Sequence, residues 1–172
     1  MTKKEFFAKY YSQALNIENQ TKINRYLILS QAYLESGAGE SVLAKKYNNF
    51  FGVKSGSNWK GEKVTLKTKE ADKSGNLYDT SADFRVYNSP ADSFKSYASV
   101  LSSKRYKDAG IFKSTDPVEQ AKAVVKGGYA TDPSYFSKVN SIIDTFKTLP
   151  VPVLGGFVGI LLLSAIIYSF VK

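Results

Sequence analysis

The chain has 172 residues, and 43% of them are hydrophobic, which is typical of one folded domain with an appendage. It contains neither cysteine nor histidine, which excludes disulfides, zinc sites of the usual Cys/His kind and catalytic triads with an imidazole base. The formal net charge of +9 favours a polyanionic partner, such as nucleic acid, anionic lipid or a bacterial wall polymer, without choosing among them. An enzyme of this composition must use carboxylates, tyrosines and backbone groups, and we predict no cofactor and no metal.

The first part of the chain is predicted to form three helices. Segment 1–15 carries aromatic residues near helical spacing and lacks the apolar run of a secretory signal, so we expect an amphipathic first helix. Apolar residues at i, i+4 and i+7 predict a second helix over Thr21–Ser36, which the Ser-Gly-Ala-Gly sequence ends. Segment 40–48 predicts a short third helix with Val42 facing inward.

A change in periodicity predicts a β-hairpin in the middle of the chain. Residues 63–70, KVTLKTKE, alternate between a lysine-rich face and a more apolar face that ends at Glu70. Residues 81–87 alternate again, and the sequence ADKSGN between the two segments supplies a turn. We therefore predict two short antiparallel strands.

Three further helices are predicted from a repeated start signal. In each case a Ser or Asp suited to helix capping precedes a proline, as in Ser89-Pro90, Asp116-Pro117 and Asp132-Pro133. Apolar residues at helical spacing follow each pair. Residues 1–149 are thus predicted to form one mostly helical domain with a small hairpin.

The C-terminal segment is predicted to be a membrane anchor. Residues 151–171 contain no charged side chain, and as a helix they would reach about 31 Å, close to the thickness of a hydrocarbon core. We assign 150–172 to a transmembrane anchor that contacts lipid through 151–171. Because no signal precedes the domain, we expect the anchor to lie in the internal membrane of a lipid-containing phage virion. The alternative is the membrane of the bacterial host.

The acid Glu35 ends the predicted second helix. The helix dipole is negative at this end, and neighbouring apolar side chains remove water, so both effects raise the pKa of the carboxyl. A carboxyl with a raised pKa retains its proton near neutral pH and suits general acid catalysis. The alternative is a solvated glutamate at a helix terminus.

The residues around Glu35 resemble a known family. The sequence LESGAGESVLAKKYNNFFGVK contains Glu followed by Ser-Gly-x-Gly, then Ser-x-Leu-Ala and Asn-x-Phe-Gly-x-Lys. With FRVYNSPADSFKSYASVL and GGYATDPSYFSKV further along, it resembles glycoside hydrolase family 73, the bacterial and phage β-N-acetylglucosaminidases of peptidoglycan. The similarity spans about residues 27–143 and implies a lysozyme-like α+β fold, with a helical lobe and a small hairpin lobe across a cleft. Ala38 stands where this family often has an aromatic residue.

The resemblance implies roles for three residues in catalysis. Glu35 corresponds to the general acid of the family. Glu70 corresponds to a second carboxylate proposed as base or stabiliser, and it is also the only acid on the apolar face of its predicted strand. Tyr129 in GGYATDP corresponds to a family tyrosine implicated in the site.

Four further residues are predicted to bind substrate. Asn49 and Phe50 are expected to border the sugar cleft. Trp59 lies in a polar loop and is predicted to stack on a sugar, with a structural anchor as the alternative. Asp132 is assigned to the substrate site, although its proline neighbour also fits a cap of the last helix.

These features together predict a peptidoglycan hydrolase that cleaves the β-1,4 glycosidic bond after N-acetylglucosamine, as a phage lytic enzyme at entry or release. One alternative is a muramidase or lytic transglycosylase of the same fold, although the chain lacks a GLMQ-type string after the Glu motif. A second alternative is a non-catalytic, membrane-tethered module that holds a polyanion. The expected partners are glycan strands and lipid rather than nucleic acid.

Overall fold

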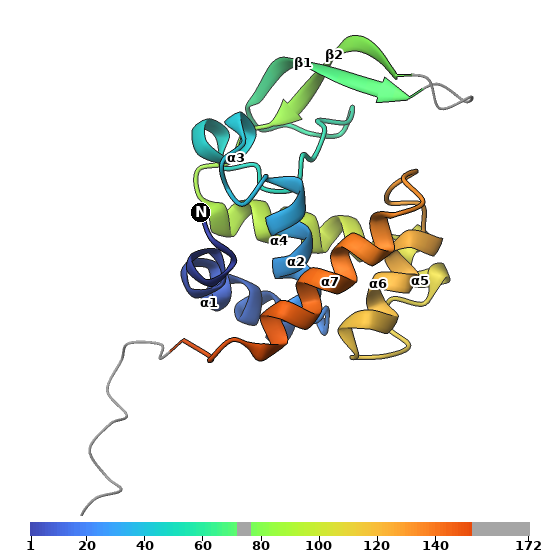
Figure 1. Ribbon diagram of the computed structural model, residues 1–172. Helices are drawn as coiled ribbons and strands as arrows, with labels where there is room; N and C mark the ends of the chain where they lie inside the picture. The colour runs from blue at the N-terminus through green and yellow to red at the C-terminus, as the bar shows by residue number, and fades with distance from the viewer. Residues whose placement is uncertain (72–76, 153–172) are drawn as a thin grey trace, which may run out of the picture.

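The structure is a computed structural model, and it describes residues 1–71 and 77–152 of the chain. The fold is α+β, with a two-stranded antiparallel sheet at one end of a body of helices (Figure 1). In chain order the elements are α1 (Lys3–Thr21), α2 (Arg25–Glu35), α3 (Val42–Tyr47), β1 (Lys63–Ala71), β2 (Leu77–Arg85), α4 (Pro90–Leu101), α5 (Lys104–Ala109), α6 (Pro117–Lys126) and α7 (Tyr135–Thr148).

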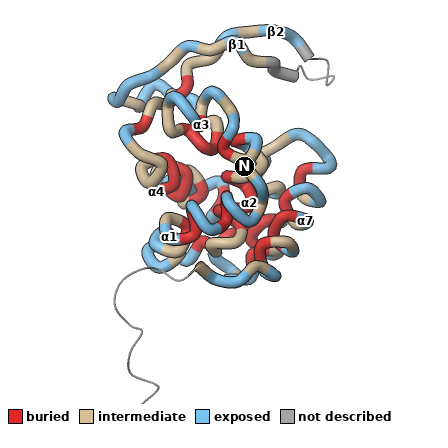
Figure 2. The backbone as a smooth tube through the Cα atoms, turned by 60° about the vertical axis from the view of Figure 1, so that its left-hand side comes forward, coloured by how far each residue is buried: buried red, intermediate tan, exposed pale blue. Residues whose placement is uncertain are grey.

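Helix α2 runs through the centre of the helical body. It packs against α1, α6 and α7, and its residues 27–32 are all buried. The buried segments of α1, α4 and α7 gather around it, as Figure 2 shows. Because most helical stability in proteins comes from such packing, the end of α2 that carries Glu35 is held in a fixed place.

The hairpin is attached to this body at one end only. Its two strands pair from Lys63 opposite Arg85 to Ala71 opposite Leu77. Segment 53–55 extends the pairing on the other edge of β2, where the Arg85 N–H donates to Val53 O at 3.0 Å. Most of the hairpin is half-buried or exposed (Figure 2). The predicted α+β architecture is confirmed.

Two of the three predicted helix starts are confirmed at their predicted positions. Ser89 Oγ accepts from the Asp92 N–H at 3.3 Å at the start of α4, and Asp116 Oδ1 accepts from the Val118 N–H at 2.9 Å at the start of α6. The third start differs, because α7 begins only at Tyr135. The Asp132-Pro133 pair forms a turn before this helix instead.

Other boundaries also differ from the sequence expectation. Helix α1 continues to Thr21 and ends where Lys22 adopts a φ of 68°, so α2 begins at Arg25 rather than at Thr21. Helix α5 was not predicted, because six residues are too few to show a helical period. Val42 was expected to face inward and is 54% exposed, since it occupies the first position of α3.

The predicted membrane span at 151–171 lies almost entirely outside the described residues, as does most of the predicted second domain at 150–172. Within 1–71 and 77–152, no helix combines the length and the apolar character needed to cross a membrane.

Candidate active site

A cleft of about 620 Å³ opens beside the C-terminal end of α2. Its walls come from segment 51–54 below the hairpin, from α4 and α5, and from segment 128–132 with the first residue of α7. Among the described residues, its lining contains two carboxylates, Glu35 and Asp132. The cleft thus lies where the helical body meets the chain that supports the hairpin.

The turn after α2 explains the Ser-Gly-Ala-Gly sequence. Residues 37–39 all have left-handed φ values between 56° and 79°, a conformation that glycine adopts most easily. The buried Ser36 hydroxyl holds this turn, because it donates to Ala32 O at 2.5 Å and accepts from the Gly39 N–H at 2.7 Å. The helix therefore stops directly after Glu35.

Glu35 has one hydrogen-bond partner among the described residues. The Tyr135 hydroxyl donates to Glu35 Oε1 at 2.6 Å. The side chain as a whole is exposed in the cleft, yet the surrounding protein desolvates the carboxyl, and this raises the pKa of Glu35. The hydrogen bond from Tyr135 lowers the pKa by less. The carboxyl therefore holds its proton to a higher pH than an ordinary glutamate.

A chain of hydrogen bonds leads from Glu35 into the core. Tyr135 accepts from Gln31 Nε2 at 2.9 Å, and Gln31 Oε1 accepts from the Tyr97 hydroxyl. Gln31 and Tyr97 are fully buried. Burial raises the pKa values of both tyrosines above their usual range, so both phenols remain neutral.

Aromatic rings line the same cleft. Phe51 stacks on Tyr97 with the ring centroids 3.8 Å apart and the planes at 4°. Tyr129 contacts the edge of Tyr97 at 6.0 Å and lies 5.7 Å from the Tyr135 ring. Desolvation, and then the nearby Glu35, raise the pKa of Tyr129. The structure therefore brings Tyr129 to the site, although the hydroxyl that contacts Glu35 is that of Tyr135.

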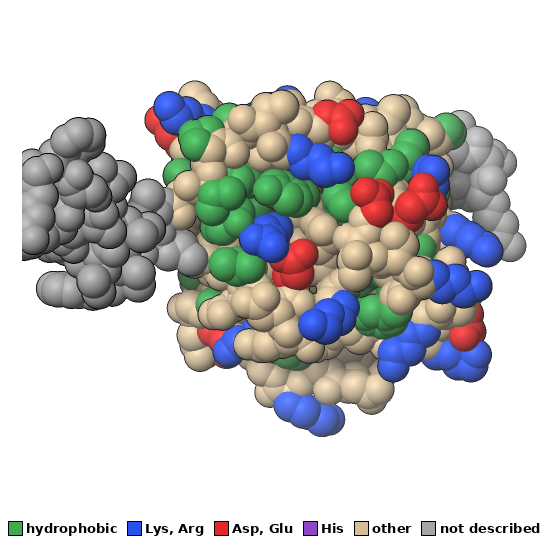
Figure 3. Space-filling view, turned by 90° about the horizontal axis from the view of Figure 1, so that it is seen from below, with side chains coloured by type: hydrophobic (Ala, Val, Ile, Leu, Met, Phe, Trp, Pro, Cys, Tyr) green, Lys and Arg blue, Asp and Glu red, His purple; other side chains and the backbone are tan. Residues whose placement is uncertain are grey.

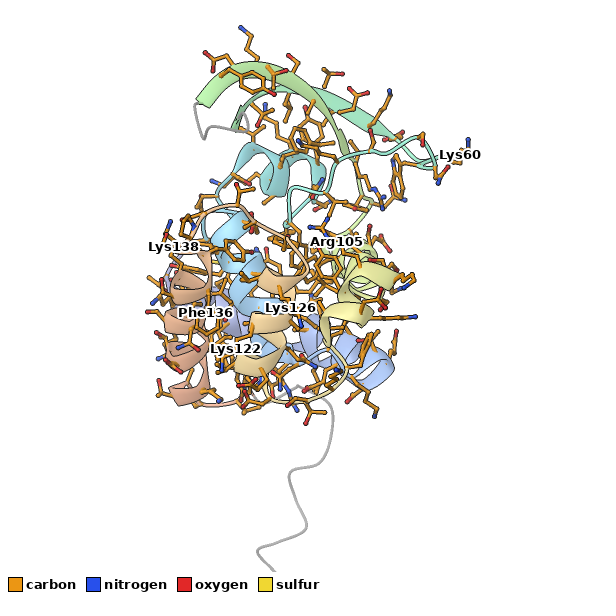
Figure 4. The ribbon with its side chains drawn as sticks, turned by 90° about the vertical axis from the view of Figure 1, so that its right-hand side faces the viewer. Lys60, Arg105, Lys122, Lys126, Phe136 and Lys138 are labelled. Atoms are coloured by element: carbon orange, nitrogen blue, oxygen red, sulfur yellow. The ribbon has the colours of Figure 1, made fainter. Side chains whose placement is uncertain are left out.

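Arg105 on α5 holds the segment that carries Tyr129. Its guanidinium donates to the carbonyl oxygens of Gly127 and Gly128. Gly128 has a φ of 72°, and any side chain there would collide with Arg105. Figure 4 shows Arg105 at the upper edge of the helical body, on the side of the hairpin. Arg105 also lines the cleft and brings a positive charge to it.

Asp132 lines the cleft as an ionised carboxylate. It pairs with Lys138 at 2.7 Å, and its Oδ1 accepts from the hydroxyl of Ser134 at 2.7 Å and from the Ser134 N–H at 2.8 Å. These contacts, Lys138 first, lower the pKa of Asp132 to about 2. Asp132 therefore carries charge wherever Glu35 titrates, and it cannot supply a proton there.

Asn49 and Phe50 do not line the cleft. Phe50 is buried among the rings of the core. The buried Asn49 side chain donates to Val53 O at 3.0 Å and to Arg85 O at 2.9 Å, and its Oδ1 accepts from the Val53 N–H at 3.0 Å. Asn49 thus fastens segment 51–54 to β2. It supports the cleft wall formed by segment 51–54 without lining the cleft itself.

Trp59 lies outside this cleft and borders a separate groove of about 410 Å³. The Arg85 guanidinium lies over its ring, 4.5 Å from the centroid, and its Nε1 donates to Glu62 O at 2.9 Å. Gly61 approaches so closely that a Cβ there would stand 2.5 Å from the ring. These contacts favour the structural anchor that was the alternative to sugar stacking.

Glu70 is placed by the strand register, opposite Tyr78. Its side chain lies outside the described residues. On the described part of the hairpin, Asp83 contacts Lys63 at 2.5 Å and Thr65 at 2.6 Å.

Sequence reasoning missed Gln31, Tyr97, Arg105 and Tyr135. Gln31 had a recognisable signal, since it lies four residues before Glu35 and thus on the same face of α2. Tyr97 and Tyr135 have no such signal, because their contacts with Gln31 join elements that lie far apart in the chain.

The described side chains form no cluster of three or more acidic residues that would hold a metal ion. Positive charge is also not gathered into one patch on the face seen in Figure 3, where Lys and Arg side chains are spread among acidic ones. The candidate active site is the cleft around Glu35, because this cleft is lined by one desolvated carboxyl and one ionised carboxylate.

Comparison with known proteins identifies the family. The profile of the glucosaminidase family, described as mannosyl-glycoprotein endo-beta-N-acetylglucosaminidase, matches residues 11–148. The chain belongs to the glucosaminidase family. The predicted resemblance and the predicted class, a glycoside hydrolase, are confirmed.

Curated relatives and solved structures agree with this glucosaminidase assignment. Peptidoglycan hydrolase FlgJ of Escherichia coli is 33% identical over 85% of this chain and 47% of its own length. Exo-glucosaminidase LytG of Bacillus subtilis is 38% identical over 70% of this chain and 43% of its own. The chain thus spans about half the length of these relatives.

The fold of the glucosaminidase domain is also shared with solved structures. A C-terminally truncated glycoside hydrolase domain of Salmonella typhimurium FlgJ superposes with a TM-score of 0.71 at 33% identity, over 87% of this chain and all of that one. The catalytic domain of the autolysin Auto from Listeria monocytogenes gives a TM-score of 0.73 at 30% identity, over 84% of each chain. The described domain therefore shares its overall fold with these solved domains.

Proposed function

We propose that this chain hydrolyses the β-1,4 glycosidic bonds of peptidoglycan, with Glu35 as the general acid. The observation that carries the proposal is a carboxyl with a raised pKa in the cleft of a glucosaminidase domain. A general acid must hold its proton until the departing sugar oxygen takes it. The name of one relative, a peptidoglycan hydrolase, supports the choice of polymer, and that of another, an exo-glucosaminidase, supports the choice of sugar.

The cleft provides the other groups that the reaction needs. As Glu35 protonates the glycosidic oxygen, the bond to the anomeric carbon breaks and positive charge develops on the sugar. Asp132 remains ionised and places a negative charge in the same cleft, while Glu70 remains the second carboxylate suggested by the family resemblance. Water then adds to the anomeric carbon, and its proton passes to a carboxylate. Tyr129 is assigned to contact with the sugar at this centre.

We also infer that the bond cleaved follows N-acetylglucosamine and that residues 151–171 anchor the chain in a membrane. The uncharged composition of 151–171 supports the anchor. A lipid-containing phage particle is the proposed location, with the host membrane as the alternative. Co-sedimentation of the full chain with lipid vesicles, lost when 151–171 are deleted, tests the anchor.

The catalytic assignment is tested by Glu35→Gln in the full chain, with purified peptidoglycan as substrate. We expect digestion to fall by about 10²- to 10⁴-fold. Glu40→Gln is the matched control and should digest normally, because Glu40 is exposed and pairs with the N-terminus at 3.1 Å outside the cleft.

The products separate the alternatives. New reducing ends of N-acetylglucosamine support the proposed bond, those of N-acetylmuramic acid indicate a muramidase, and 1,6-anhydro ends indicate a lytic transglycosylase. Digestion by Glu35→Gln at the parent rate would refute the catalytic role of Glu35.

A further inference from the structure

The hydrogen bonds behind Glu35 determine which carboxyl oxygen is open to the cleft. Tyr135 contacts Oε1 at 2.6 Å. Glu35 Oε2 has no hydrogen-bond partner among the described residues, and Glu35 lines the cleft. The two oxygens are therefore unequal before any substrate binds.

The amide of Gln31 sets the direction of this contact. An amide nitrogen only donates and an amide oxygen only accepts. Gln31 Nε2 donates to the Tyr135 oxygen at 2.9 Å, and Gln31 Oε1 accepts from Tyr97. With Gln31 donating to it, Tyr135 directs its own hydrogen to Glu35. The reversed amide would instead draw the Tyr135 hydrogen to Gln31 and leave Tyr135 to accept a proton from Glu35.

Burial makes this arrangement costly to break. Gln31 and Tyr97 are 0% exposed, and Tyr135 is 7% exposed. A buried amide without partners costs free energy, and Gln31 finds its side-chain partners among the described residues in these two tyrosines alone. Helices α2, α4 and α7, which carry these three side chains, contribute residues to the same hydrophobic core.

We propose that Gln31, held by Tyr97, is a positioning residue that makes Tyr135 donate to Glu35 Oε1 and so reserves Oε2 for the proton delivered to the substrate. This inference rests on the proposed function, in which Glu35 is the general acid. It assigns Gln31 and Tyr97 no contact with the sugar. Their effect is on the orientation and acidity of Glu35.

The other ionisable groups of the cleft stay in place in the test. Lys54, Arg105 and Asp132 supply the charges that line it. Tyr106 and Tyr129 are neutral phenols whose pKa values are raised by burial. A change in the titration of Glu35 when the side chain of Tyr135, Gln31 or Tyr97 is altered therefore reports on the hydrogen bonds that join these residues to Glu35.

The experiment compares Tyr135→Phe, Gln31→Met and Tyr97→Phe in the full chain. The Glu35 titration is followed by carboxyl carbon NMR, with the signal assigned by its absence in Glu35→Gln, and by the alkaline limb of the rate of peptidoglycan digestion. Tyr87→Phe is the matched control, because it removes one buried tyrosine hydroxyl, bonded to Ser96 at 2.8 Å, away from the cleft. Thermal melting shows that each variant is folded.

We expect Tyr135→Phe to move the Glu35 midpoint upward by about one pH unit, because the ionised carboxylate loses a donor. Gln31→Met should move it upward by less, Tyr97→Phe by least, and Tyr87→Phe not at all. Gln31→Met should add nothing in the Tyr135→Phe background. The rate at saturating substrate should fall about tenfold in Tyr135→Phe with little change in KM.

A downward shift in Tyr135→Phe would overturn the proposal, because it would show that Tyr135 accepts the Glu35 proton. An unchanged midpoint would also overturn it. If Glu35→Gln loses digestion while either of these results is found, the inference fails and the proposed function stands. Full digestion by Glu35→Gln would refute the function, and with it this inference.

Discussion

The helical body and the hairpin β1–β2 hold their side chains in different ways. In the body, buried rings interlock, as in the contact between Tyr10 and Phe50 at 4.8 Å. On the described part of the hairpin, side chains are mostly half-buried or exposed, and a typical contact is the Lys63–Asp83 pair at the surface. Burial of apolar area contributes far more to stability than exposed ion pairs do. The body therefore fixes Glu35 in place, while the hairpin, none of whose described residues lines the cleft, is less firmly held.

The largest expected effect is a loss of stability when a ring of the core is truncated, and it is compared with truncation of a hairpin side chain. Phe94 is fully buried and packs on Phe51 at 5.2 Å and on Phe50 at 6.0 Å. We expect Phe94→Ala to lower the free energy of unfolding by about 3–5 kcal/mol. Leu66→Ala, at a half-buried position of β1, should lower it by about 1 kcal/mol. Urea unfolding measures both.

The comparison fails if Leu66→Ala destabilises the protein as much as Phe94→Ala does. Such a result would mean that the hairpin and the body unfold as one equally packed unit. A separate early loss of hairpin signal would sharpen the contrast instead, because it would show that the hairpin opens locally while the body stays folded.

A smaller effect is expected at the junction between the two regions. Asn49→Ala leaves Val53 O, Arg85 O and the Val53 N–H without their partner. We expect the free energy of unfolding to fall by about 2–3 kcal/mol, and KM to rise because segment 51–54 loses its attachment to β2. Thr65→Val, which removes an exposed bond to Asp83 at 2.6 Å, is the control and should cost less than about 0.5 kcal/mol.

The Asn49 variant also decides between two roles for this side chain. Stability and substrate affinity should fall together if Asn49 supports the wall from behind. A rise in KM at unchanged stability would favour the direct sugar contact that the sequence predicted, and would contradict the supporting role.

Features that depend on a few consecutive residues could be predicted from the sequence. Local signals sufficed for the hairpin and for the starts of α4 and α6, because a period of two and a capping residue before proline act within a few residues. Glu35 and its turn were likewise recognisable, since the motif lies in one continuous segment.

The hydrogen-bond partner of Glu35 was not recognisable, because it comes from a distant part of the chain. Tyr135 is 100 residues away in sequence and contacts Glu35 only through the packing of α7 on α2. Asn49 and Phe50 look like cleft residues in the motif, but the chain turns them into the core and leaves Phe51 at the cleft. Which side of a loop faces substrate is decided by tertiary packing.

The smallest expected effect concerns the cost of holding the acid in the body. Desolvation raises the pKa of Glu35 above its ordinary value of 4.5, so the folded state binds this proton more tightly than the unfolded state does. Proton binding at Glu35 makes its full contribution to the free energy of unfolding below pH 4.5. This contribution is lost as the pH rises through the folded-state pKa. The amide side chain of the Glu35→Gln variant does not titrate. This variant should therefore match the parent in acid and exceed its Tm at higher pH, by no more than about 4 °C.

Melting curves of the parent and Glu35→Gln across this pH range measure the difference, in which the titration of Asp132 and the other carboxylates cancels. Glu40→Gln gives the opposite expectation, because Lys45 and the N-terminus lower the pKa of that exposed carboxyl. If the Tm of Glu35→Gln instead falls below that of the parent as the pH rises, the ionised carboxylate is the form that the fold stabilises. Tyr135 would then outweigh desolvation, and the site would hold a base rather than an acid.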